Sequence, residues 1–322
     1  MNKCSWANGE PIESYHDNEH GKMPANNIDL FEMLTLEIFQ PGLSFNIVLK
    51  KRDGLRQFFK NYDLKQISSM TEDDIKAGLS NDNIIKHRLK IESVINNAIN
   101  IISREYDLQT YLYDNIDYRY GLEQVGPLLS KQMKKDGFKF VGPSVCTSLL
   151  EAIGLLPAHS IDCLYASVIT NSFSYQTKFG ALHIEYDNFT IIKSSLIHNS
   201  VCNPYTSCNS FEHFLIYHID NYMNNSIENF KLLLNTNGTK FQEVVWDAVR
   251  HVPFGQTRTY GDIAFIIGSG AFRAVGAAVG KCNFALFIPA QRIVSSSGIG
   301  GFQNQIELKR EMLIHEGIDK YK

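Results

Sequence analysis

The pattern of apolar and polar positions gives the two halves of the chain a different character. In residues 1 to about 165, apolar residues recur at the three- and four-residue spacing of a helix, as in 29–40 and 83–102. A Pro-Gly pair ends the first of these helices, and Lys90 lies on the polar side of the second. A lysine-bearing helix, the hairpin GFKFVGP and a further helix follow. This pattern predicts an α-helical N-terminal half.

The second half shows shorter and more varied patterns. The polar stretch 170–177 is typical of a linker. From residue 179 to about 230, alternating runs such as ALHIEYDNFTIIKSS predict strands, and FEHFLIYHIDNYM predicts a helix. Residues 238–322 contain three short helical patterns and a strand-like run, FALFI. We expect an α/β or α+β arrangement here.

Composition narrows the class of protein. A chain of 322 residues with 44% apolar and 20% charged residues is typical of a globular protein with two or three domains. It has no apolar run near 18 residues and no basic-flanked apolar leader, which favours a cytoplasmic protein without a membrane partner. The six cysteines are scattered, so they are better candidates for metal ligands or core residues than for disulfides. We expect a monomer.

Charge is unevenly distributed. The net charge of −3 does not by itself indicate a nucleic-acid-binding protein. Residues 238–310, however, carry eight Lys or Arg against four Asp or Glu, which gives this segment +4. An excess of this size is compatible with a surface that faces DNA.

One carboxylate falls on an apolar helix face. Leu30, Leu34 and Ile38 follow helical spacing, and Glu37, seven residues after Leu30, lies on the same face. Burying a carboxylate is costly unless it is paired or functional. Taken alone, the pattern favours a buried glutamate neutralised by a nearby Lys or Arg, and a functional carboxylate is the alternative.

Five motifs of the N-terminal half occur in an informative order: KCSW, YHDNEHG, LEIFQPGLSF, KKDGFKFVGP and AHSIDC. Together they resemble the motifs of the DNA-3-methyladenine glycosylase I family over residues 1 to about 165. The resemblance implies an all-α helix-hairpin-helix domain that flips a nucleotide out of alkylated double-stranded DNA. It implies hydrolysis of the N-glycosidic bond of 3-methyladenine. The alternative is a sensor that binds alkylation damage through both halves without catalysis.

The resemblance also implies one structural zinc ion per chain. Cys4, His16, His159 and Cys163 match the family's zinc ligands by motif position. They form a Cys₂His₂ set with no open position, which suits structure rather than catalysis. His159 and Cys163 are expected one helical turn apart, while Cys4 and His16 come from the other end of the domain. Without the resemblance, a free thiol and a surface histidine are the simpler interpretation.

The same resemblance assigns the base-binding residues. Glu37 is implied as the catalytic residue, which accepts hydrogen bonds from the adenine edge and favours positive charge on the base or sugar. Tyr15 hydrogen-bonds the base, and Trp6 and Phe45 stack on it, which suits a cationic base. Phe45 and His20 depart from the family, which has tryptophan at both positions; phenylalanine keeps a stacking face, and His20 alters the pocket. Taken singly, each aromatic residue is more often part of a core.

The hairpin is implied to bind DNA. Lys131, Lys134 and Lys135 share one face of the helix before the GFKFVG turn. A lysine face alone is usually only solvated, but next to this turn it favours contact with phosphates. The turn residues that the resemblance assigns to the DNA interface are Gly137, Lys139 and Gly142.

A second resemblance covers residues 238–317. The runs GTKFQEVVWDAVRHVPFGQTRTYGDIAFIIG, FRAVGAAVG, IPAQRIVSSSGIGGF and HEG resemble methylated-DNA–cysteine methyltransferase. The resemblance implies a helix-turn-helix formed by helices 260–267 and 271–279. By family position, Arg273 fills the space left by a flipped base, and Tyr260 presses on the phosphate of the flipped nucleotide. Close helix packing is the alternative explanation for the small residues of the second helix.

The reactive loop of this second family has changed. Its Pro-Cys-His-Arg reads Pro-Ala-Gln-Arg here, with Ala290 and Gln291 in place of the thiol and the base, although Glu316 remains. Alanine has no atom that accepts an alkyl group. We do not expect Cys282 to substitute, because it lies outside this loop and has no base partner in the sequence. The half therefore resembles alkyltransferase-like proteins, which bind alkylated guanine without repairing it; a structural appendage is the alternative.

These arguments predict a multidomain protein. We expect a helix-hairpin-helix glycosylase domain with structural zinc over residues 1–165. A small α/β domain, similar to ribonuclease H, is expected over 166–235, and a winged-helix DNA-binding domain similar to the methyltransferase over 236–322.

Overall fold

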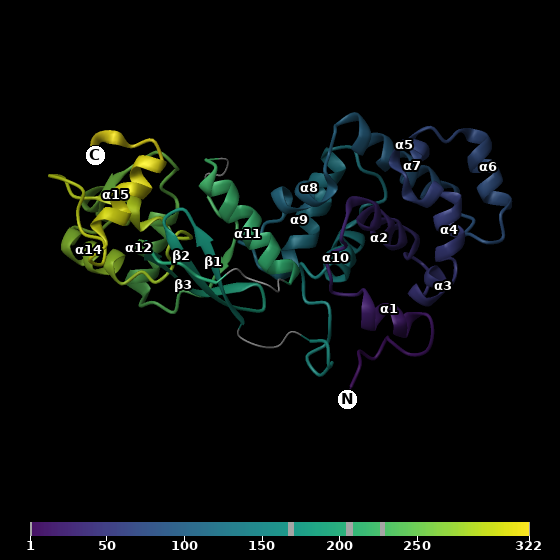
Figure 1. Ribbon diagram of the computed structural model, residues 1–322, viewed down its shortest axis with the longest axis horizontal. Coiled ribbons are helices and arrows are strands. Elements are labelled where there is room, and N and C mark those ends of the chain that lie inside the picture. Colours follow the sequence, from purple (N-terminus) through teal and green to yellow (C-terminus); the bar gives the residue numbers. More distant parts are fainter. Residues whose placement is uncertain (1, 167–170, 204–208, 226–228, 322) are drawn as a thin grey trace. The chain divides into compact units, whose positions relative to one another are not determined.

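The chain forms two compact units (Figure 1). The computed structural model describes residues 2–166, 171–203, 209–225 and 229–321. Unit 1 comprises Met1–Ser167 and Asn209–Phe211, and unit 2 comprises Val168–Cys208 and Glu212–Lys322. The further boundary that the sequence predicts near residue 235 stays a prediction.

Unit 1 is helical, as the sequence predicts. Its helices are α1 (Ile12–Asn18), α2 (Asn27–Phe39), α3 (Phe45–Lys50), α4 (Arg52–Phe58), α5 (Leu64–Ser68), α6 (Glu72–Ser80), α7 (Arg88–Ser103), α8 (Leu108–Asn115), α9 (Leu122–Lys135) and α10 (Pro143–Ala152), with the short 3-10 helix η1 (Lys60–Tyr62) after α4. Every residue of α2 from Leu30 to Phe39 is buried, so this helix forms the centre of the unit.

Local chemistry fixes both ends of α2. The Asn26 side chain accepts a hydrogen bond from the Asp29 backbone N–H and so caps the first turn. At the other end, the buried Lys90 ammonium donates to the carbonyls of Phe39 and Pro41, at 2.8 Å each. The expectation that Lys90 lies on a polar surface is therefore wrong, because its amine satisfies carbonyls that the helix end leaves open.

Helix α7 begins later than the apolar pattern predicts. It starts at Arg88 rather than near residue 83, because the His87 side chain accepts from the Lys90 backbone N–H and caps the helix there. The apolar Ile84 before it is buried in a turn rather than in a helix. Apolar spacing alone does not distinguish these cases.

The predicted helix-hairpin-helix is confirmed as a structural element. Helices α9 and α10 pack closely where a Cβ atom on Gly126 would lie 2.0 Å from the Thr147 hydroxyl oxygen, so only glycine fits. The turn between them begins at Gly137, whose φ of +94° is accessible to glycine.

Unit 2 contains a four-stranded sheet in the order β1-β2-β3-β4. Strands β1 (Asn171–Thr177), β2 (Gly180–Asp187) and β3 (Thr190–His198) are antiparallel neighbours, and the short β4 (Leu233–Leu234) runs parallel to β3. Helix α11 (Ser210–Met223) packs on this sheet through hydrogen bonds from Tyr175 to Asp220 and from Tyr186 to Glu212. The sheet and helix confirm an α/β region, whereas its likeness to ribonuclease H stays a prediction.

Two expectations for this unit are wrong. Residues 171–177 form strand β1 rather than a linker; the strand buries Phe173 and Thr177 and leaves polar residues between them, so its apolar signal is weak. The run FALFI forms turns rather than a strand, with a single bridge from Phe284 to Ser194 of β3. Its apolar residues are buried by the packing of these turns.

The last part of unit 2 contains mainly short helices. They are α12 (Lys240–Arg250), α13 (Tyr260–Ile266), α14 (Phe272–Gly280) and α15 (Ile306–His315), with the 3-10 helices η2 (Ala290–Arg292) and η3 (Asp319–Tyr321) and the parallel pair β5 (Arg258–Thr259) and β6 (Ile293–Val294). Helices α13 and α14 confirm the two helices predicted for the helix-turn-helix, while the winged-helix assignment stays a prediction. Within the described ranges, every helix is too short or too polar to cross a lipid bilayer.

Candidate active site and metal centre

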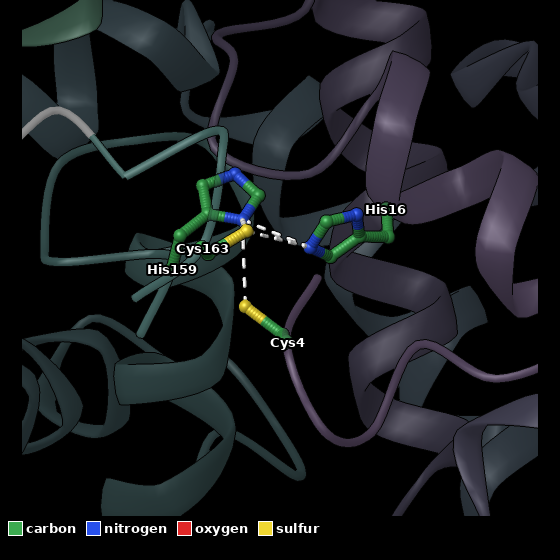
Figure 2. A group of neighbouring side chains, drawn as sticks. All are labelled: Cys4, His16, His159 and Cys163. Atoms are coloured by element: carbon green, nitrogen blue, oxygen red, sulfur yellow. Dashed lines mark hydrogen bonds between the residues drawn. The ribbon is translucent and has the colours of Figure 1, made fainter. Parts of the chain in front are cut away.

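Four side chains from the two ends of unit 1 meet in one cluster (Figure 2). Cys4 precedes α1, His16 lies on it, and His159 and Cys163 belong to the segment after α10. The Nε2 atom of His16 lies 3.2 Å from Nδ1 of His159 and 3.4 Å from the Cys163 sulfur. The two sulfurs each lie 3.7 Å from Nδ1 of His159. The fold therefore brings together the four residues that the sequence motifs indicate as metal ligands.

These separations fit a single tetrahedral ion. An ion with bonds of about 2.0–2.3 Å would hold its four ligand atoms about 3.3–3.8 Å apart. The other ring nitrogens are also held: His16 Nδ1 lies 2.8 Å from the Asp17 carboxylate, and His159 Nε2 lies 3.3 Å from the carbonyl of His20. Such contacts orient histidines whose free nitrogen faces a metal. The donor set and its surroundings both suit zinc.

The surroundings of Cys4 also favour binding of a cation. The Ser160 backbone N–H and hydroxyl donate to the Cys4 sulfur. Burial raises the pKa of the Cys4 thiol, but hydrogen bonds from Ser160, His16 and Cys163 outweigh this effect, so its pKa lies below the usual value. We expected His159 and Cys163 one turn apart on a helix. They lie instead in a series of turns, which brings both side chains to the same cluster.

Glu37 on α2 is buried and has no cationic partner within the described part of the chain. Only 5% of the residue is exposed, and its Oε2 atom has no hydrogen-bond partner among the described residues. Burial, with a smaller effect of the Glu151 charge, raises the pKa of Glu37 to about 8. The simpler interpretation of a glutamate neutralised by Lys or Arg is therefore wrong for Glu37.

The same helix carries a glutamate that does fit the simpler interpretation. Glu32 is also buried, but it accepts hydrogen bonds from Arg52 and Arg56, each at 2.8 Å. On this helix, the Glu32 carboxylate is therefore paired with arginines, whereas the Oε2 atom of Glu37 has no hydrogen-bond partner among the described residues. An open, desolvated carboxylate is typical of a binding or catalytic site.

The aromatic residues predicted for the base form one group around Tyr15. The Tyr15 ring lies 5.0 Å from that of Phe45 and 5.7 Å from that of His20, and His20 lies 4.9 Å from Trp6. Burial, and then the charge of Glu37, raises the pKa of Tyr15 well above its usual value, so the phenol stays protonated. Tyr15 thus links the aromatic group to the carboxylate. This arrangement suits a flat, cationic ligand.

His20 has a defined orientation in this group. Its Nε2 atom lies 2.8 Å from the carbonyl oxygen of Ala158, while its Nδ1 atom is buried without a partner among the described residues. Burial lowers the pKa of His20 to about 4, so the ring is neutral near pH 7.

In the hairpin, the three predicted lysines are exposed, but part of the backbone of the turn is already hydrogen-bonded within the protein. Lys131, Lys134 and Lys135 are exposed on α9. Sequence analysis missed Asn97 of α7, whose buried amide donates to the carbonyl of Lys139 and accepts from its N–H, at 3.0 and 2.7 Å. The Lys139 N–H is engaged, Val141 is buried and Pro143 has no N–H, so the backbone donors left for a phosphate are those of Phe140, Gly142 and Ser144. The contact that we expect between backbone N–H groups and a DNA phosphate is therefore limited to the part of the turn after Lys139.

In unit 2, the altered loop borders a cavity of about 410 Å³. Tyr260, Ala290 and Gln291 line it. The Gln291 amide, which stands where the resemblance implies a histidine base, donates to Glu316 at 2.9 Å. Glu316 is buried and also accepts from Arg292 at 2.7 Å. The carboxylate is thus fully engaged in holding the loop.

Cys282 lies outside the altered loop in the sequence but lines the same cavity. The chain returns past β3 at Asn283, which brings residue 282 towards the loop. Burial raises the pKa of the Cys282 thiol to about 11. The sulfur is therefore in its weakly nucleophilic thiol form near pH 7.

The other predicted DNA-contacting residues of unit 2 lie around α14. Arg273 is exposed in the first turn of α14, and Tyr260 is half-buried, with its ring against Gly276. Phe265 and Phe272, on the two sides of the turn between α13 and α14, are exposed. Their apolar character resembled core residues in the sequence.

Comparisons with known proteins match both units. The methyladenine glycosylase family matches residues 6–166, and the DNA-binding domain of 6-O-methylguanine DNA methyltransferase matches residues 240–318. DNA-3-methyladenine glycosylase 1 of Escherichia coli is 34% identical over 51% of this chain and 96% of its own length. A probable methylated-DNA–protein-cysteine methyltransferase of Acanthamoeba polyphaga mimivirus is 35% identical over 44% of this chain and 93% of its own length.

The chain is a fusion of these two families. A solved structure of 3-methyladenine DNA glycosylase I from Staphylococcus aureus is 32% identical and aligns with a TM-score of 0.46, over 51% of this chain and 96% of its own. The glycosylase match includes the segments that carry Glu37, the aromatic group and three of the four clustered ligands, with Cys4 just before it. The methyltransferase match includes Ala290 and Gln291.

Proposed function

We propose that the glycosylase half hydrolyses the N-glycosidic bond of 3-methyladenine in alkylated DNA, with Glu37 as the catalytic residue. The observation that carries this proposal is the buried Glu37 carboxylate, which has an open oxygen and no cationic partner among the described residues. A base methylated at N3 is cationic, so its glycosidic bond is already weakened. The missing positive partner of Glu37 is then the base itself, or the sugar cation that develops as the bond breaks.

The aromatic group holds the base in this mechanism. Tyr15 hydrogen-bonds the flipped base, and Trp6 and Phe45 stack on it. Ring faces attract a cation more strongly than a neutral adenine, and this difference favours the lesion. Phenylalanine at position 45 retains the stacking face with a smaller area than tryptophan.

The metal ion has a structural role in this proposal. Cys4, His16, His159 and Cys163 hold one zinc ion, which joins the two ends of the glycosylase half. When bound, zinc supplies folding free energy and leaves no open position for chemistry.

The hairpin positions the DNA. Lys131, Lys134 and Lys135 contact phosphates electrostatically, while the second part of the turn donates backbone N–H groups. Asn97 holds the turn in the required conformation through the backbone of Lys139. The lesion base is thereby presented to the aromatic group.

The test of this function is the release of free base. Full-length protein is incubated with DNA carrying radiolabelled methyl groups, and the released bases are separated by chromatography. We expect labelled 3-methyladenine in the free fraction. Tight binding to the methylated DNA with no released base would favour the non-catalytic damage sensor instead.

For the methyltransferase-like half, we propose binding of DNA with an alkylated guanine and no transfer of the alkyl group. Ala290 has no lone pair, and Gln291 cannot take a proton from a neighbour. Cys282 is held as a thiol, which supports the same conclusion. Arg273 and the cavity next to Tyr260 provide the parts needed for binding alone.

Transfer and binding are measured separately. DNA with O6-methylguanine labelled in the methyl group should keep its label after incubation with the full-length protein, and label found on Cys282 or any other residue contradicts the proposal. Arg273→Ala should weaken binding to this DNA by about tenfold at low salt. Lys320→Ala, which removes an exposed charge elsewhere in unit 2, is the matched control. Equal affinity in the two variants would favour the structural appendage.

A further inference from the structure

The His20 ring is fixed in one tautomer by its surroundings. A carbonyl oxygen can only accept a hydrogen bond, so the contact with the Ala158 carbonyl at 2.8 Å requires the proton on Nε2. In the neutral ring, Nδ1 then carries a lone pair and acts as an acceptor. The orientation is reinforced from the other side, because His159 Nε2 lies 3.3 Å from the His20 carbonyl. Two reciprocal contacts thus hold residue 20 against the segment 158–159.

The acceptor on Nδ1 is left open inside the aromatic group. The atom is buried, and no described residue donates to it. The centroid of the His20 ring lies 4.9 Å from that of Trp6, 5.2 Å from that of His159 and 5.7 Å from that of Tyr15. A buried acceptor without a donor costs about 1–3 kcal/mol. Such a cost is typical of a position that a ligand completes.

A second open acceptor belongs to the same group. The Oε2 atom of Glu37 is buried and without a partner among the described residues, and its charge acts on Tyr15, which also contacts His20. A ligand with N–H donors pairs with the His20 Nδ1 lone pair, and a cationic one also favours the ionised, accepting form of the Glu37 carboxyl. An amino-bearing base has such donors, whereas a base without an exocyclic amine has fewer.

We propose that His20 determines base specificity: its Nδ1 atom accepts a hydrogen bond from the exocyclic amino group of the flipped base. This inference rests on the proposed excision of a methylated base. A tryptophan at this position has only a donor on its ring. The substitution to histidine therefore makes the site selective for 6-amino purines over analogues that lack the amine. Rejection of such analogues follows because they leave the buried acceptor unpaired.

The test compares two free bases and two proteins. Full-length wild type and His20→Phe are titrated with 3-methyladenine and with 3-methylpurine, which lacks the amino group. Phenylalanine keeps a flat ring and removes the acceptor. The wild type should prefer 3-methyladenine, and His20→Phe should reduce the ratio of the two affinities by about fivefold to tenfold. Any effect of the amine on the basicity of the purine is common to both proteins and cancels.

A spectroscopic measurement on the wild type removes the dependence on the variant's folding. The unprotonated ¹⁵N resonance of His20, assigned by its loss in the His20→Phe spectrum or by nearest contacts, should shift when 3-methyladenine saturates the protein. It should shift much less with 3-methylpurine. An unchanged affinity ratio in a folded His20→Phe variant, or an unchanged ¹⁵N resonance, would overturn the proposal.

The outcome separates this inference from the proposed function. A wild type that releases 3-methyladenine from DNA but shows no dependence of the affinity ratio on His20 refutes the role of His20 alone. A wild type that shows this dependence but releases no base refutes excision and leaves the role of His20 in base recognition standing.

Discussion

Two buried glutamates of α2 differ in their hydrogen-bond partners, and this difference determines which of them is a candidate for function. Glu32 and Glu37 are both buried on one helix, but Glu32 accepts hydrogen bonds from Arg52 and Arg56, whereas Glu37 has no such partner among the described residues. Helical spacing placed Glu37 on the buried face correctly. It did not reveal that this carboxylate is open, because partners about twenty residues away in the sequence are not visible in a local pattern.

This difference has a consequence for stability. The pKa of Glu37 is raised by burial from 4.5 to about 8, so between these pH values the folded protein binds more protons than the unfolded chain. Its free energy of unfolding should therefore fall as the pH rises through this window. Glu37→Gln removes the effect, and the variant should be more stable than the wild type by a few kcal/mol at pH 8.5.

Chemical denaturation at pH 5 and pH 8.5 measures this difference. The advantage of Glu37→Gln should be small at pH 5 and large at pH 8.5. Glu32→Gln is the matched control and should be destabilised, because it removes an acceptor from two arginines. A pH-independent difference for Glu37→Gln would contradict a raised pKa.

At the scale of elements, the hairpin between α9 and α10 was predictable because glycines and a run of lysines mark it. Its support by Asn97 was not predictable, because a buried asparagine on a distant helix has no signature in the sequence. The strand β1 was missed because only Phe173 and Thr177 are buried, and the residues around them are mostly serine, glutamine and asparagine. The run 284–288 was misread because burial in turns gives the same apolar pattern as a strand.

The lysine face of α9 leads to a salt-dependent prediction. Lys134 is exposed beside the turn and is proposed to contact a phosphate. Lys134→Ala should weaken binding to any DNA sequence and reduce the slope of log affinity against log salt by about 1. Lys76→Ala removes an exposed lysine on α6 and should leave the slope unchanged. Equal slopes for both variants would exclude Lys134 from the interface.

The metal cluster ties together segments that are far apart in the sequence. We expect about one zinc per folded chain by metal analysis, and a strong chelator should lower the melting temperature of the glycosylase half. Cys163→Ser should lower both the zinc content and the melting temperature. Cys202→Ser, which changes a cysteine outside the cluster, should change neither. A zinc content well below one per chain would contradict the assignment.

At the scale of the whole molecule, one chain joins two families whose printed descriptions both concern methylated DNA bases. In the glycosylase half, Glu37 is the proposed catalytic residue, and Phe45 and His20 stand where the resemblance implies tryptophan. In the methyltransferase-like half, Arg292 and Glu316 form a buried ion pair, and Ala290 and Gln291 stand where the resemblance implies a reactive cysteine and histidine. The sequence motifs identified both halves, and the structure added that Cys282 shares the cavity of the altered loop.

Excision of 3-methyladenine by Glu37 is the proposal from which the others follow. The most direct measurement is the rate at which wild type and Glu37→Gln release 3-methyladenine from the same methylated DNA, with DNA affinity measured in parallel. The wild type should release the base, and the variant should be about 100- to 1,000-fold slower with nearly unchanged affinity for DNA. Absence of release by the wild type, or an equal rate in Glu37→Gln, would contradict this account.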